Sequence, residues 1–258
     1  MRRKDLTSKL LAVTDGMVGT VTNLVLINLY CLTLLGGVKT MGDANRMVEE
    51  VHNMLDTVNY NSIKRAISHL KTQGLILRPK HDKLTLSITK LGQDRIANIV
   101  PMYRTERPWD GYLYLISYDI PKKSNASRDR LREYIRRTGG ALLQESLWMN
   151  PYNPTLILED FVRLRRISGT VLVSKLGKDG AIGNENLDVL LDRIYHLHTL
   201  VKRYQTFIDT YKQVKHPSLL SLSLEYFSIL KDDPQLPFDL LPNNFPAEHA
   251  YQLFEAYG

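Results

Sequence analysis

The chain has 258 residues, of which 43% are hydrophobic and 24% are charged, and its formal net charge is +7. This length and composition exclude a disordered chain and allow about two or three small domains, each with its own core. The single cysteine, Cys31, excludes a disulfide framework and a zinc site built from cysteines. We expect an ordinary soluble protein, and its cysteine content is compatible with the cytoplasm, where we expect it to be located.

The positive charge is unevenly distributed along the chain. Residues 1–100 contain 14 Lys and Arg against 8 Asp and Glu, and residues 101–185 contain 14 against 10. Residues 186–258 contain 6 against 9 and are therefore acidic. A basic excess in the first two thirds indicates a polyanionic partner, bound through its phosphates.

The first part of the chain is predicted to be helical. Helices are expected over residues 5–13 and 20–35, and Asp43 can cap a third helix that extends to about residue 56. The run Met17 to Val38 has no charged residue over 22 positions, which is long enough to span a bilayer. Its asparagines, threonines and glycines favour a buried helix or pair of helices instead, although a membrane-associated segment is the alternative.

A helix with one polar face is predicted next, between Val58 and Ile76. Its apolar residues Ile63, Ala66, Ile67 and Leu70 are spaced i, i+3, i+4, i+7 and so share one face. Gly74 provides the left-handed stop. Strands are then expected at 75–78 and 84–88 around a basic turn, followed by a helix from 90 to about 99.

This order of elements predicts a winged helix-turn-helix domain over residues 1–100. The polar helix would enter the major groove of DNA, and the basic hairpin would contact the neighbouring phosphates. The alternative is an ordinary amphipathic helix whose polar face is solvated. The residues expected to read bases are Asn59, Asn61, Ser62 and Arg65. Those expected to contact phosphates are Lys64, His69, Lys71, Arg78, Lys80 and Lys83.

A second domain is predicted over residues 112–180, after a proline-containing linker at 101–111. Its strands and helices alternate as in a ferredoxin-like βαββαβ module, with an antiparallel sheet and the helices on one face. The expected elements are a strand at 112–120, a helix at 128–138, a strand or strand pair at 141–150, a helix at 156–167 and a strand at 170–176. The arginines of the first helix are expected to form a solvated face, paired with Asp129 and Glu133.

The third part, residues 181–258, is predicted to be a helical domain. One long helix is expected from Asn186 to about Val214, and a second from about Leu219 to Lys231. The segment DDPQLPFDLLP, residues 232–242, follows, and we call it the strap. Its three prolines fix the backbone, so the strap must be rigid and its apolar residues must dock on another part of the protein.

The strap resembles the DPxLPxxLLP signature of the PaaX family of transcriptional repressors. The segment YLISYDIPKKSNASRDRLREYIRRTGGALLQESLWMNP resembles the module that this family shares with the small subunit of CRISPR adaptation. The resemblance implies an α+β protein that is a homodimer, binds double-stranded DNA and leaves it when an acyl- or aryl-CoA thioester binds. It implies no cofactor and no enzymatic activity. Phe245 stands where the family pattern has tryptophan. This difference bears on which effector the protein binds and does not affect the expected fold.

Two alternatives remain open at this point. In the CRISPR subunit an aspartate at the end of the first strand helps to bind a metal across the dimer, and Asp119 has this position here. A metal-dependent nuclease is therefore one alternative, but a single carboxylate holds Mg²⁺ poorly, and Asp119 is expected to have a structural role. A dimeric protein-binding adaptor is the other. The strap itself is expected to brace the C-terminal helices and the dimer without taking part in chemistry.

Overall fold

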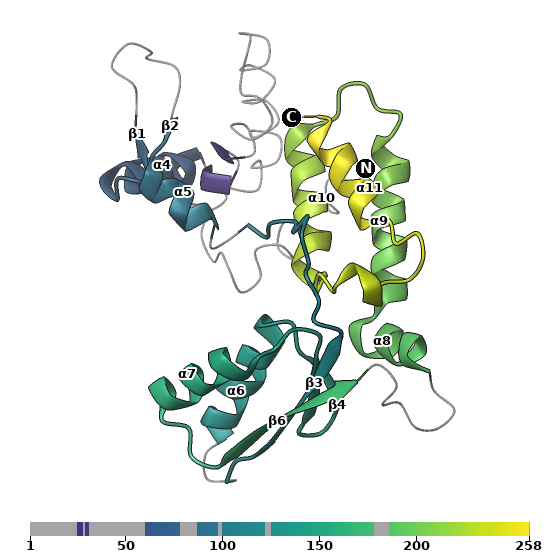
Figure 1. The fold of residues 1–258 in the computed structure, drawn as a ribbon. Helices are drawn as coiled ribbons and strands as arrows, with labels where there is room; N and C mark the ends of the chain where they lie inside the picture. Colours follow the sequence, from purple (N-terminus) through teal and green to yellow (C-terminus); the bar gives the residue numbers. More distant parts are fainter. Residues whose placement is uncertain are drawn as a thin grey trace. The chain divides into compact units, whose positions relative to one another are not determined.

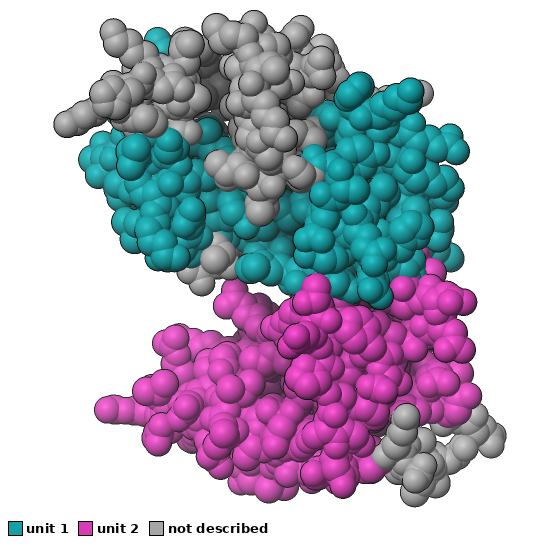
Figure 2. Space-filling model, turned by 45° about the horizontal axis from the view of Figure 1, so that its top comes forward, with its two compact units in different colours: residues 1–103, 202–232, 246–258 teal, residues 104–201, 233–245 magenta. Residues whose placement is uncertain are grey.

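The structure is a computed structural model that describes residues 25–27, 29–30, 60–77, 87–97, 100–121, 125–177 and 186–257. The chain forms two compact units, coloured separately in Figure 2. Unit 1 contains residues 1–103, 202–232 and 246–258, and unit 2 contains residues 104–201 and 233–245. All but the first residue of the strap therefore belongs to unit 2. The expectation that the strap braces the C-terminal helices stays a prediction.

Unit 2 contains the predicted ferredoxin-like module. Its four strands lie in the order β4-β5-β3-β6, and all neighbours are antiparallel. The helices cover one face of this sheet (Figure 1). The βαββαβ prediction is thus confirmed. The elements in chain order are β3 (Tyr112–Asp119), α6 (Asn125–Arg137), β4 (Ala141–Gln144), β5 (Leu147–Asn150), α7 (Thr155–Arg165) and β6 (Thr170–Gly177).

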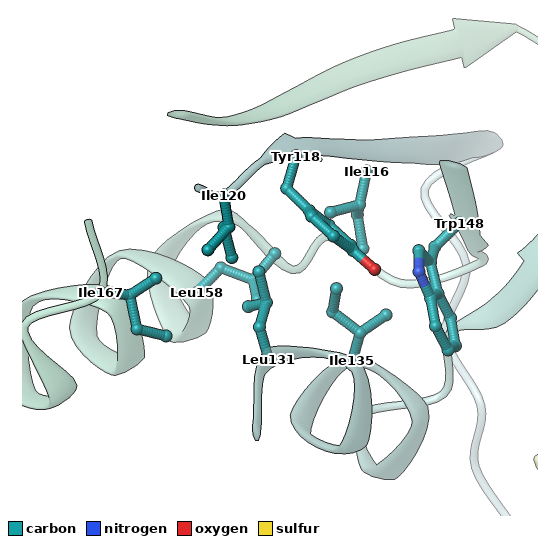
Figure 3. Packing of buried hydrophobic residues seen from close by; sticks show 8 residues of the cluster. All are labelled: Ile116, Tyr118, Ile120, Leu131, Ile135, Trp148, Leu158 and Ile167. Atoms are coloured by element: carbon teal, nitrogen blue, oxygen red, sulfur yellow. The ribbon is translucent and has the colours of Figure 1, made fainter. Parts of the chain in front are cut away.

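The core of this module lies between the sheet and the two helices (Figure 3). Alternate residues of β3 and its continuation, Ile116 and Ile120 among them, point toward the helices because side chains alternate along a strand. Leu131 and Ile135 of α6 meet them from one helical face, since they are four residues apart. Gly169 precedes β6 with φ of +113°, and a Cβ there would lie 2.2 Å from the carbonyl oxygen of Asp119.

The C-terminal helices pack through aromatic side chains. They are α9 (Leu197–Tyr211), α10 (Leu219–Asp232) and α11 (Ala247–Glu255), with the short helix η2 (Phe238–Leu240) between the last two. Tyr226 of α10 stacks on Phe254 of α11 with ring centroids 4.5 Å apart, and Phe207 of α9 lies 5.6 Å from Tyr226. The helical C-terminal region predicted from the sequence is present.

The single long helix predicted from residue 186 to about 214 is interrupted. It ends as α8 (Leu187–Tyr195), and α9 begins at Leu197. His196 between them is left-handed, with φ of 54°. The backbone N–H of His198 donates to Asp192 Oδ1 at 2.7 Å, so an α8 side chain caps the start of α9. No glycine or proline marks this break, and the apolar stripe continues across it, which is why periodicity alone predicted one helix.

Little of the first 56 residues lies within the described part. Residues 25–27 and 29–30 are helical, and Val25, Leu26 and Ile27 are buried. The rest of the uncharged run 17–38 and the helices expected at 5–13 and 43–56 lie outside the described residues. None of the helices that the structure describes is both long and apolar enough to cross a membrane.

Candidate nucleic-acid interface

The helix α4 (Tyr60–Thr72) has one buried and one exposed face. Ala66 and Leu70 are buried, as the i, i+4 spacing predicts. The exposed side chains on the opposite side include Lys64, Arg65, Ser68, His69 and Lys71. Three of these side chains are permanently basic at neutral pH, so the helix presents positive charge to the solvent.

The end of α4 is fixed by its own backbone. Gly74 has φ of +69°, and its N–H donates to the Lys71 carbonyl at 3.0 Å. The N–H of Leu75 donates to the Leu70 carbonyl at 2.9 Å, which completes a Schellman motif. The buried side chain of Leu75 follows directly. The predicted glycine stop is confirmed, and it directs the chain into the hairpin.

The base of the predicted hairpin is present directly after α4 in the chain. Strands β1 (Ile76–Leu77) and β2 (Ser87–Ile88) are antiparallel. Thr89 Oγ1 donates to the Gly74 carbonyl at 2.6 Å and accepts from the N–H of Gly92 at 3.1 Å. It thereby links the end of α4 to the first turn of α5 (Lys90–Ala97). Helix, hairpin base and following helix form one connected assembly.

Four predicted contact residues are brought together on the exposed face of α4, namely Lys64, Arg65, His69 and Lys71. Asn61 and Ser62 lie in its first turn. Asn59 and the hairpin residues Arg78, Lys80 and Lys83 lie outside the described residues. Two polar residues that were not predicted to contact DNA, Ser68 and Thr72, share the exposed face, as the helical period indicates.

Asp119 is exposed at the end of β3 and pairs in register with Thr170 of β6. Within the described ranges, no three His, Cys, Asp or Glu side chains gather where they could hold a metal ion. A divalent cation needs several oxygen ligands, and Asp119 has no such set around it in this part of the chain.

The arginines of α6 are mostly engaged within the module. Arg132 Nε donates to the hydroxyl of Tyr118 at 2.7 Å, and Arg128 donates to the Ile120 carbonyl at 2.6 Å. Arg136 and Arg137 both pair with Glu133, at 2.6 and 3.3 Å. The predicted pairing with Glu133 is confirmed, and Arg132 Nη1 also lies 3.7 Å from Asp129 Oδ1.

Fold and comparisons define the class as an α+β protein in which a ferredoxin-like module precedes a helical C-terminal region. Residues 106–184 match the PaaX protein central Cas2-like domain, and residues 195–258 match the PaaX-like protein C-terminal domain. Together the two matches cover more than half of the chain, and the chain belongs to the PaaX family. These domains indicate a PaaX-like regulator. The matches begin at residue 106, so the winged helix-turn-helix stays a prediction.

Among solved structures, the fold is similar to that of a protein aligned over nearly its full length. It is the uncharacterized protein Rv0674 from Mycobacterium tuberculosis, with a TM-score of 0.53 and 16% sequence identity. The alignment covers 98% of this chain and 93% of that protein. At this identity the likeness concerns the fold alone. No curated protein sequence matches the chain.

Proposed function

We propose that the protein is a sequence-specific regulator of transcription that binds double-stranded DNA as a dimeric repressor. The observation that carries this proposal is the exposed polar face of α4, where Lys64, Arg65, His69 and Lys71 lie together on a helix held by a Schellman motif. A helix with an exposed basic face fits a major groove, and the basic hairpin predicted after it would approach the backbone.

The residues of α4 have distinct expected roles. Arg65 would read a guanine, because its planar guanidinium can donate to both O6 and N7. Asn59, Asn61 and Ser62 would read neighbouring bases from the start of the helix. The phosphate contacts would come from Lys64, His69 and Lys71 and from the hairpin residues Arg78, Lys80 and Lys83.

The edge of the ferredoxin-like sheet supports a homodimer. All eight residues of β6 pair with β3, and no bulge or proline interrupts the strand. Its outer edge is unpaired within the described chain, and such an edge is a site for strand addition. Pairing of two β6 strands about Val173 would place Lys175 opposite Val171 of the partner, so no like charges would meet.

The effector is the part of the proposal that rests on the family resemblance alone. We propose a small ligand, such as an acyl- or aryl-CoA thioester, that releases the protein from DNA.

Selection of binding sites from random duplex DNA, followed by affinity measurements at several salt concentrations, tests the DNA-binding proposal. We expect Arg65→Ala to lower the preference for the selected sequence by about 1–3 kcal/mol at one base pair. Lys71→Ala should instead weaken binding to all sequences and reduce the salt slope by about one. Arg165→Ala on α7 is the matched control and should change neither quantity. Selection of no sequence by the wild-type protein, or equal binding by an Arg65/Lys71 double alanine variant, would refute the proposal.

A further inference from the structure

The strap is bound to the linker that leads out of the predicted DNA-binding domain. The backbone N–H of Arg104 donates to Gln235 Oε1 at 2.7 Å, and Arg107 Nη1 donates to the Leu236 carbonyl at 3.1 Å. These contacts join positions 131 and 129 residues apart in the chain. All of them lie within unit 2. The linker is therefore not a free tether at these positions.

Gln235 is the centre of this contact. Its φ is 51°, a left-handed conformation that residues with a side chain rarely adopt. Three hydrogen bonds hold it there: its N–H donates to Asp233 Oδ1 at 2.7 Å, its carbonyl accepts from the Tyr152 hydroxyl at 2.8 Å, and its side chain accepts from Arg104. A glycine would adopt this conformation at lower cost, but it could not accept the bond from Arg104. A glutamine at this position therefore provides a hydrogen-bond acceptor for the linker that a glycine would lack.

Arg107 holds the linker from the other side. Its side chain is only 5% exposed, and its Nε donates to the Arg104 carbonyl at 3.1 Å. The guanidinium lies over the ring of Phe238, 4.7 Å from the ring centroid. Burying an arginine is costly unless its donors are used, and here Nε binds a backbone carbonyl of the linker while Nη1 binds one of the strap. Immediately before this site, within unit 1, Tyr103 stacks on Tyr251 of α11.

We propose that the strap is a clamp for the linker, and that Gln235 and Arg107 thereby set the separation of DNA half-sites that a dimer can bind. The inference rests on the proposed function, because it assigns the strap a role in DNA specificity. A dimeric reader recognises two half-sites at one spacing only if its reading helices are held at a defined distance. A linker bound at Arg104 and Arg107 shortens the free segment that precedes it, whereas a fully flexible linker would allow several spacings.

The clamp can be tested without DNA by limited trypsin digestion. Arg104 is exposed and is followed by threonine, whereas Pro108 protects the bond after Arg107. Trypsin can cleave after Arg104 only when the linker has detached from the strap. The cleavage rate therefore reports the fraction of molecules in which the linker is detached. We expect Gln235→Gly, which keeps the left-handed backbone and removes the acceptor, to raise this rate about tenfold, as for one lost hydrogen bond. Gln235→Glu keeps an oxygen at Oε1 and should restore a rate near that of the wild type.

Asp239→Asn, an exposed change in η2, is the matched control and should leave the cleavage rate unchanged. Circular dichroism would verify that each variant is folded. An unchanged rate in Gln235→Gly, or an equal increase in Asp239→Asn, would overturn the clamp.

The role in specificity is tested with duplexes in which the two selected half-sites are moved apart by one to several base pairs. The wild-type protein should bind one spacing more tightly than the others. In Gln235→Gly this ratio of affinities should fall about tenfold, while the affinity for a single half-site should stay unchanged. Faster cleavage with an unchanged spacing preference would show that the strap holds the linker without setting the spacing. If the wild type selects no DNA sequence, the proposed function fails, while the trypsin result still decides whether the clamp exists.

Discussion

At the scale of single residues, Gly92 is fixed by close packing. A Cβ at this position would lie 2.2 Å from the Leu75 carbonyl oxygen and 2.7 Å from Ile88 Cγ2. Its neighbours are the end of α4 and the base of the hairpin, so α5 can approach them only without a side chain here. The sequence shows a glycine inside a predicted helix, where it normally costs stability, and the reason for it becomes visible only in the packing.

We expect Gly92→Ala to destabilise the protein by about 1–3 kcal/mol, because overpacking outweighs the gain in helix propensity. Urea unfolding monitored by circular dichroism would measure the change. Gly177→Ala is the control, since a Cβ there meets no atom within 4 Å. Equal stability of the two variants would contradict the packing argument.

A second residue-scale contact lies between the linker and β3. The hydroxyl of Tyr114 donates to Asp110, and this bond lowers the pKa of Asp110 below its usual 3.8 and raises the pKa of Tyr114 to about 12. For Asp110, whose folded pKa is depressed, the stabilisation is present above the unfolded pKa and is lost as pH falls through the folded pKa. For Tyr114, whose folded pKa is raised, it is present below about pH 10 and is lost as pH rises toward 12.

The unfolding free energy of Tyr114→Phe should therefore fall below that of the wild type by a constant amount between about pH 5 and pH 9. The difference should shrink below about pH 4 and above about pH 10. Chemical denaturation across this range measures it. A difference that is independent of pH would show that the hydroxyl contributes through packing and not through Asp110.

At the scale of secondary structure, the break between α8 and α9 depends on a side-chain cap. Asp192 accepts the N–H of His198 and replaces the acceptor that the first turn of α9 lacks. Tyr195, the last residue of α8, is buried, and its hydroxyl donates to the carbonyls of Gly139 and Met149 at 3.0 and 3.1 Å. Burial raises the pKa of this tyrosine, so the hydroxyl remains a donor. The end of α8 is thus anchored to the ferredoxin-like module.

Asp192→Ala should destabilise the protein by about 1 kcal/mol, the usual effect of removing a helix cap. Asp192→Asn retains a side-chain oxygen and should be close to the wild type. Thermal unfolding of the three proteins would measure the effect. Equal loss in both variants would assign it to the charge of Asp192 and not to the hydrogen bond.

At the scale of the whole molecule, the proposed homodimer depends on the outer edge of β6. Leu172 in this strand is 58% exposed, which is unusual for a large apolar residue in a strand centre. Leu164 of α7 is 77% exposed but does not lie on the sheet edge.

If two β6 strands pair, Leu172→Glu should convert the dimer into a monomer, because the added carboxylates would lie near each other across the twofold axis. Sedimentation velocity would report the change, and Leu164→Glu is the matched control that should remain dimeric. A wild-type monomer at all concentrations, or a dimer that tolerates Leu172→Glu, would contradict this interface.

The sequence by itself determined the elements whose signals are local. The period of two in the strands, the i, i+4 face of Ala66 and Leu70 in α4, and the left-handed stop at Gly74 depend on neighbours within a turn or a strand. The βαββαβ order and the exposed basic face of α4 follow from such signals, and the structure has both.

Only the tertiary structure decided where the strap docks and where the long helix breaks. The strap could be predicted to be rigid from its prolines, but its partners Arg104 and Arg107 lie about 130 positions earlier in the chain. Likewise, the cap of α9 is Asp192 of α8. In the sequence this residue looks like any aspartate on a solvated helix face. Local periodicity specifies which face of an element is buried, but not which distant segment covers it, because that choice depends on packing between residues that no sequence spacing connects.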